Sequence, residues 1–233
     1  MNYGTRFFAI MCITTVFSSV CIGGLTYLFE RQHAIKEAQV KSHILLDLIN
    51  TSTTYFESSQ KPLVKELLKK NNKFYPELTN RFMILREYSD ILQTKSHDHH
   101  FRLASLNPLN EKNKATPKET TIIGRFRSDP QLKKQDGLIT QNHETVYFSA
   151  SPITVQDNSC LSCHGKPENA SRAQIVMYGT DNGYGWQKDE TNSALFVYIS
   201  LHQALQVAKK SAAKLFFISF ACFLLTFLVI IIF

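Results

Sequence analysis

Two long runs without a charged residue bound this chain and restrict what the rest of it can fold into. The first run has 23 residues, Phe7–Phe29, and the second has 19, Leu215–Phe233. At about 1.5 Å of rise per residue, a helix of either length is long enough to cross a hydrocarbon core of roughly 30 Å. Because lipid offers no hydrogen-bond partners, a spanning segment must satisfy its own backbone groups. Both runs are therefore predicted to be transmembrane helices, the first as an uncleaved signal anchor.

Residues 30–214 remain between the two runs and are predicted to form one soluble domain, with residues 1–6 as a short N-terminal segment. The chain is 44% hydrophobic and 12% aromatic, which leaves enough apolar side chains for a core after both runs are set aside. Its formal net charge is +7, spread over scattered lysines and arginines. This charge is predicted to belong to a solvated surface near anionic lipid, and nucleic acid is not expected as a partner.

A C-x-x-C-H pentad, Cys160–His164, determines the chemistry predicted for the soluble domain. One chemistry uses all three side chains of this motif together. Two thioethers fix a haem covalently, and the adjacent imidazole ligates the iron. The pentad therefore predicts one haem c, bound through Cys160 and Cys163, with His164 as the proximal iron ligand.

Zinc binding and dithiol redox chemistry are the alternatives for the pentad. Structural zinc usually needs four ligands, and the other cysteines, Cys12, Cys21 and Cys222, lie in the apolar runs, where a thiol behaves as a small hydrophobe. A redox dithiol sits near a βαβ pattern, whereas residues 155–159 are predicted to be a polar loop. Haem c is the favoured interpretation.

The predicted haem also sets the topology. Haem c is attached outside the bacterial cytoplasm, so residues 30–214 are expected in the periplasm and residues 1–6 in the cytoplasm, with both runs in the inner membrane. Lys209, Lys210 and Lys214 oppose this orientation under the positive-inside rule. Long translocated domains largely escape that rule, so the haem decides the orientation.

The soluble domain is predicted to begin with helices and to end with strands. Apolar residues at helical spacing continue from Glu30 to about Lys70 and again from Pro76 to Leu92. The further predicted elements are strands at 101–105, 137–140, 145–149, 174–178 and 194–200, a short helix at 119–127, loops at 71–73 and 106–117, and an exit helix at 202–214. This order indicates an α+β domain with an antiparallel sheet.

Three motifs give the chain a resemblance to a known family. They are the stretch 101–110 with Asn113 and Ala115, the C-x-x-C-H-G-x-P stretch 160–167, and the closing YG…GYGW stretch 178–186. The sequence resembles, from about Gln39 to Val207, the single-haem c-type periplasmic sensor domains that precede sensor kinases and chemotaxis receptors. The resemblance implies a PAS-like fold with long N-terminal helices, one covalent haem and a sensory role.

The chain departs from that family in two respects. No HAMP, kinase or methyl-accepting segment follows the second run, which suggests either a module that works through a partner or a truncated receptor. Some family members use a cysteine on an early helix as second axial ligand. No cysteine lies between Cys21 and Cys160, so that ligation is not expected here.

Several residues are candidates for the sixth ligand of the haem iron. His100, at the start of the signature stretch, is the first choice among the histidines, and Met83 is a thioether candidate. His43 is expected to be exposed, and water or an open position is a further alternative. The remaining histidines considered, all expected at the surface, are His97, His99, His143 and His202.

The haem periphery is predicted to contact arginine and tryptophan. Arg102 and Arg125, with Arg127, are candidates for charge-assisted hydrogen bonds to the propionates, against the alternative of plain surface arginines. Trp186 and Tyr184 either cover a haem edge or fill the core, and the core is favoured.

Two functions follow from the predicted haem. The favoured one is a non-enzymatic sensor of redox state or of a small ligand such as a gas, which signals through its transmembrane helices as a homodimer or to a partner signalling protein. The alternative is a membrane-anchored monohaem electron carrier. A haem peroxidase is less favoured because no distal acid–base pair can be named.

Overall fold

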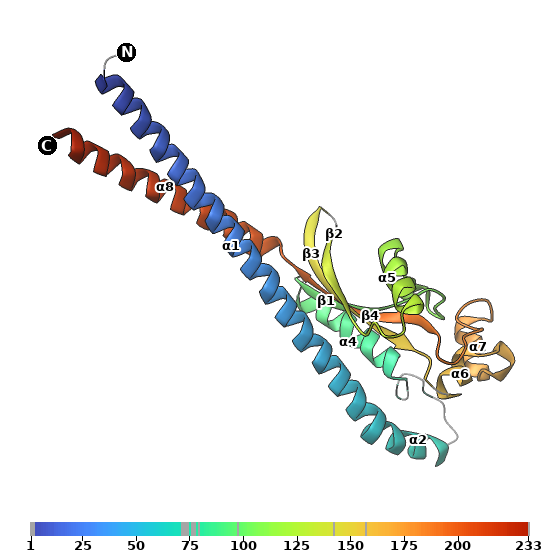
Figure 1. Cartoon of the computed structure of the whole chain (residues 1–233). Coiled ribbons are helices and arrows are strands. Elements are labelled where there is room, and N and C mark those ends of the chain that lie inside the picture. The colour runs from blue at the N-terminus through green and yellow to red at the C-terminus, as the bar shows by residue number, and fades with distance from the viewer. Residues whose placement is uncertain are drawn as a thin grey trace. The chain divides into compact units, whose positions relative to one another are not determined.

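The computed structural model describes residues 3–70, 75, 78, 80–96, 98–141, 143–156 and 158–232 (Figure 1). The chain divides into two compact units. One contains residues 1–38 and 201–233, and the other contains residues 39–200. The predicted loop at 71–73 and the histidine at position 97 lie outside the described residues.

The first unit consists of the two longest helices. α1 (Tyr3–Tyr55) begins in it, and α8 (His202–Ile232) makes up its C-terminal part. Both helices are long and apolar enough to cross a membrane. They contact each other through aromatic side chains, with the ring centroids of Phe8 and Phe227 5.3 Å apart. Each predicted span thus lies within a helix, and the predicted exit helix at 202–214 is the first part of α8.

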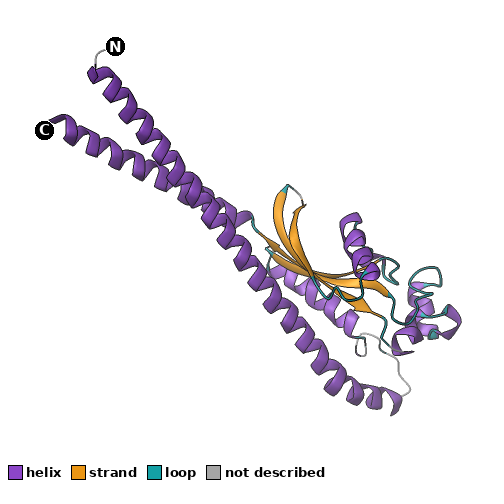
Figure 2. Ribbon diagram, in the orientation of Figure 1, coloured by secondary structure: helices purple, strands orange, loops and turns teal. Residues whose placement is uncertain are grey.

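The second unit contains a four-stranded antiparallel sheet with the order β1-β4-β3-β2 (Figure 2). Its strands are β1 (His99–Ser105), β2 (Gln135–Gln141), β3 (Glu144–Thr154) and β4 (Thr191–Ser200). The predicted α+β class is therefore confirmed, as are the predicted strands at 101–105, 137–140, 145–149 and 194–200, which extend further than expected.

Helices cover both faces of this sheet, and β4 is buried almost throughout as a result. α5 (Pro117–Ser128) packs against β4, β1 and β3, and its Ile123 and Phe126 join Phe196 of β4 and Phe148 of β3 in the main core. α4 (Arg81–Lys95) packs against β1. Figure 1 shows α4 and α5 on opposite sides of the sheet.

Local sequence signals explain where these helices begin. Asn80 caps α4 by accepting a hydrogen bond from the Phe82 backbone N–H at 2.9 Å. Thr116 and Glu119 form a capping box at the start of α5. α1 continues through a π-helical segment (Phe56–Gln60) into α2 (Lys61–Lys70), where Pro62 lacks the N–H that an α-helix would donate to residue 58.

Two predictions of local structure were wrong. The run 174–178 is not a strand but the helix α7 (Arg172–Tyr178), because Ser171 caps its start and Gly179, at a φ of 74°, ends it. The predicted polar loop 155–159 ends earlier, since the helix α6 (Asn158–His164) begins within it and carries the pentad.

Candidate functional site

A cavity of about 530 Å³ lies within the second unit, at the end of the sheet where β1 and β3 finish and β4 begins. Ser105, Thr154 and Ser193 line it from these strands. Cys160, Cys163 and His164 of α6 line it as well, as does Trp186. All three functional residues of the pentad therefore line one partly open cavity.

The His164 imidazole is held in one tautomer. Its Nδ1 lies 2.8 Å from the carbonyl oxygen of Gly183, and because a carbonyl can only accept, Nδ1 carries the proton. Burial lowers the pKa of His164, against the opposing effect of this hydrogen bond. The ring also stacks on Trp186, with centroids 4.0 Å apart. The imidazole is thus neutral, oriented, and has its Nε2 lone pair free for a metal.

The Gly183–Trp186 loop is docked against the pentad by backbone hydrogen bonds. The N–H of Gly185 donates to the carbonyl of Gly165 at 2.8 Å, and the N–H of Trp186 donates to that of His164 at 3.0 Å. Gly183 has a φ of 83°, and a Cβ there would lie 2.5 Å from Cγ of Leu109. Glycine is required at this position both by its backbone conformation and by the close approach.

Asn107 joins the signature loop to the same region. Its Oδ1 accepts a hydrogen bond from the Gly183 N–H at 2.8 Å, and its Nδ2 donates to the Tyr184 carbonyl at 3.2 Å. The three sequence motifs of the resemblance therefore meet around His164. Sequence reasoning did not single out Asn107, although it lies inside the quoted stretch 101–110.

Gln174 is a second residue that the sequence analysis missed. Its buried amide Nε2 donates to the carbonyl of Cys163 at 2.6 Å and lies 3.3 Å from the Tyr184 hydroxyl, which in turn donates to the Gly179 carbonyl. A polar residue directly before the apolar run Ile175–Met177 was the available signal. These bonds tie α7 to the pentad helix.

A positive wall, formed by lysines of α2 and arginines of α4, lines part of the cavity. Lys61 and Lys65 of α2, one helical turn apart, and Arg81 and Arg86 of α4 all border it. The one carboxylate among the described lining residues is Glu57, which lies 2.6 Å from Lys61 and 4.0 Å from Arg81. The cavity thus has an excess of positive charge, which suits an anionic ligand.

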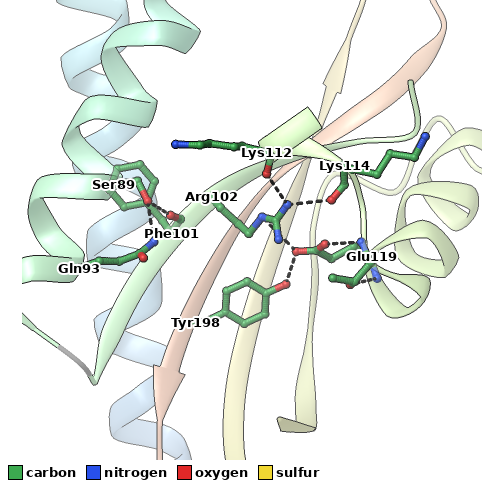
Figure 3. A network of polar contacts seen from close by, with 9 residues as sticks. Ser89, Gln93, Phe101, Arg102, Lys112, Lys114, Glu119 and Tyr198 are labelled. Atoms are coloured by element: carbon green, nitrogen blue, oxygen red, sulfur yellow. Dashed lines mark hydrogen bonds and ion pairs between the residues drawn. The ribbon is translucent and has the colours of Figure 1, made fainter. Parts of the chain in front are cut away.

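Arg102, predicted to contact haem propionates, takes part in a different network (Figure 3). It donates to the carbonyls of Lys112 and Lys114 and lies 3.7 Å from the buried carboxylate of Glu119. The Tyr198 hydroxyl donates to the same carboxylate at 2.7 Å. Burial, and then the charge of Glu119, raises the pKa of Tyr198. Arg102 therefore joins the loop after β1 to α5 and β4.

The other predicted contacts fall into two groups. His100 stacks on Tyr198, with ring centroids 4.8 Å apart. Among the described residues, the cavity lining does not include His100, Arg102 or Arg125. Arg127 pairs with Glu190. Trp186 does line the cavity, as does Met83. The geometry therefore gives no support to His100 as an iron ligand or to Arg102 and Arg125 as propionate partners.

The remaining histidine candidates are engaged elsewhere. His43 on α1 lies 3.5 Å from Asp136 of β2, and His99 lies 3.2 Å from the Ser96 hydroxyl. His143 occupies the β2–β3 turn with a φ of 65°. No histidine other than His164 lines the cavity in the part of the chain that the structure describes.

The residues of the cavity fit a haem better than the two alternatives. Within the described ranges, no three His, Cys, Asp or Glu side chains converge as metal ligands, as zinc would require. The strand β3 does lead into α6, so one argument against a dithiol is weakened, but the sheet is antiparallel and contains no βαβ unit. A haem would also offer a propionate to the buried indole N–H of Trp186, which has no partner among the described residues.

Comparisons with known proteins place the chain in one family. A family model described as Tll0287-like matches residues 30–200. The crystal structure of the cyanobacterial heme-protein Tll0287 aligns with 18% identity and a TM-score of 0.43, over 74% of this chain and 94% of that one. No curated protein shows significant sequence similarity to the chain.

Proposed function

The chain belongs to the Tll0287-like family, and we propose on this basis that it is a membrane-anchored haem c protein that senses redox state or a small ligand. Tll0287, whose name the family carries, is described as a heme-protein. In this chain Cys160 and Cys163 would hold the macrocycle and His164 would ligate the iron. The bound haem would supply a one-electron couple and a site for a small ligand.

The protein would lie in the inner membrane with residues 30–214 in the periplasm. This proposal is supported by the two long apolar helices and by the site of haem c attachment. We also propose that the protein has no enzymatic activity and that its α+β domain has a PAS-like arrangement. The active form would be a homodimer, or a complex with a membrane partner that receives the signal.

The observation that carries the sensory role is the direct connection between the cavity wall and both apolar helices. α1 continues through the π-helical segment into α2, and Glu57, Lys61 and Lys65 on this path line the cavity. Ser193, near the start of β4, also lines the cavity, and β4 leads through Leu201 into α8. A change at the haem would thus act on segments that continue into the membrane.

Hydrogen exchange of the full chain in detergent, oxidised and reduced, tests this role. We expect the protection of residues 61–70 and 202–214 to differ between the two states, while α5, on the other side of the sheet, serves as the internal control. Exchange differences confined to residues 158–186 would contradict signalling and would favour electron transfer.

Electron transfer is a second proposed function, and the exposure of the two pentad cysteines supports it. Both Cys160 and Cys163 are partly exposed, so the haem edge that they hold would be accessible to a redox partner. A carrier needs such an edge and no rearrangement of the helices. The exchange experiment above separates the two functions.

The positive wall should tune the haem potential. Replacing Arg81 and Arg86 by glutamine is expected to lower the midpoint potential by tens of millivolts, on the order of 1 kcal/mol, because nearby cations favour the reduced, less positive iron. Potentiometric titration measures this shift. Lys118→Gln, on α5, is the matched control and should leave the potential unchanged. An unchanged potential in the haem-loaded double variant would contradict the proposal that the haem lies close to this wall.

A further inference from the structure

We propose that Met83 would supply the second axial ligand of the iron. This proposal rests on the proposed haem function, and it names a ligand that the pentad does not provide. Met83 is half-buried in the first turn of α4 and lines the cavity. Three observations lead to this assignment: the donors available in the cavity, the elements that carry them, and the environment of Met83 itself.

Few side chains in the cavity can ligate haem iron. The residue types that do so in proteins are histidine, cysteine, methionine and tyrosine. Outside the pentad, the described cavity-lining residues of these types are Met83, Met177 and Tyr178. The lysines of the cavity are ammonium groups without a lone pair, and Lys61 is already paired with Glu57.

Met177 and Tyr178 belong to the same wall as the pentad. Both lie on α7, which Gln174 fastens to the carbonyl of Cys163. Because α7 is fastened to the pentad helix, its residues would be held in place together with His164, whereas a second ligand from another element would join a separate part of the cavity lining to the haem. Met83 lies instead on α4, which packs against β1.

The surroundings of Met83 leave its thioether available. The buried residues of α4 are Leu85 and Ser89, and Ser89 donates to the carbonyl of Phe101. Met83 is not among them, so packing of α4 on the sheet does not consume its side chain. Its backbone is fixed by the N-cap, with its N–H 3.1 Å from the Asn80 carbonyl. A flexible, polarisable thioether on a fixed backbone can reach an iron without distorting the helix.

Spectroscopy of the haem-loaded full chain in detergent tests the assignment. Wild-type ferric protein should be low-spin and show the weak near-infrared charge-transfer band of thioether ligation. Met83→Ala should lose this band, become high-spin, and bind carbon monoxide when reduced. Met83→His should stay low-spin, lose the band and have a lower midpoint potential, because methionine ligation raises the potential. Met177→Ala is the matched control and should match the wild type.

Several results would overturn the proposal. A wild-type spectrum without the thioether band does so without any variant, so a failure of Met83→Ala to fold leaves the test intact. A Met83→Ala spectrum identical to the wild type, or loss of the band in Met177→Ala, does so as well. In each of these cases a haem is still attached and the proposed function stands. A wild-type chain without covalent haem would instead refute both.

Discussion

Replacing Cys160 and Cys163 together by alanine is expected to abolish covalent haem binding completely. Each proposed thioether would form through one of these sulfur atoms, and no other cysteine of the chain lies outside the apolar runs. Haem staining of a denaturing gel measures the loss, because only covalently bound haem survives denaturation. Each single variant keeps one sulfur atom and should retain part of the stain.

Cys222→Ala is the matched control for these variants. Cys222 is exposed on α8 in the first unit and should be dispensable for haem attachment. An undiminished stain in the double variant, with the protein present at wild-type level, would contradict attachment at the pentad.

Glu119→Ala is expected to destabilise the folded chain by about 3 kcal/mol or more. The substitution removes a buried carboxylate that accepts hydrogen bonds from Tyr198 and from the backbone N–H of Thr116, and leaves the Arg102 guanidinium without its charge partner. Each buried polar group left without its partner costs about 1–3 kcal/mol, and the substitution also removes the capping box of α5. Urea denaturation followed by the fluorescence of Trp186, the only tryptophan, measures the change.

Glu111→Ala provides the comparison for this effect. Glu111 is exposed, and its carboxylate contacts Asn182 at 3.4 Å, so its removal should cost roughly 0.5 kcal/mol or less. Equal stability losses in the two variants would contradict the account of Glu119 as a buried connection between α5, β1 and β4.

The sequence predicted the fold class because the relevant signals are local. Alternation along 194–200 identified the central strand, and helical spacing from Glu30 identified the helix that continues from the first apolar run. Burial on both faces of β4 could not be read from the sequence, since it depends on α4 and α5 covering the sheet from two sides. The run 174–178 was misassigned because Ile175 and Val176 favour strands, while the caps at Ser171 and Gly179 determine the structure.

The pentad could be recognised in the sequence because its signal is also local. Cys160, Cys163 and His164 are contiguous, so their motif is visible in one dimension. The positive wall comes from α2 and α4, which lie far from the pentad in sequence, and no local pattern marks it. Arg102 was chosen for its place in a motif, yet alternation along β1 puts it on the α5 face, where it meets Glu119. Proximity in sequence to a motif is a poor guide to which strand face a side chain occupies.

The most direct test of the haem assignment is the intact mass of the purified full chain under denaturing conditions, after expression in a bacterial host with a c-type cytochrome maturation system. One haem per chain, lost on replacement of both Cys160 and Cys163, is the predicted result. A chain of unmodified mass from that host would contradict covalent haem binding and leave the pentad to zinc or dithiol chemistry.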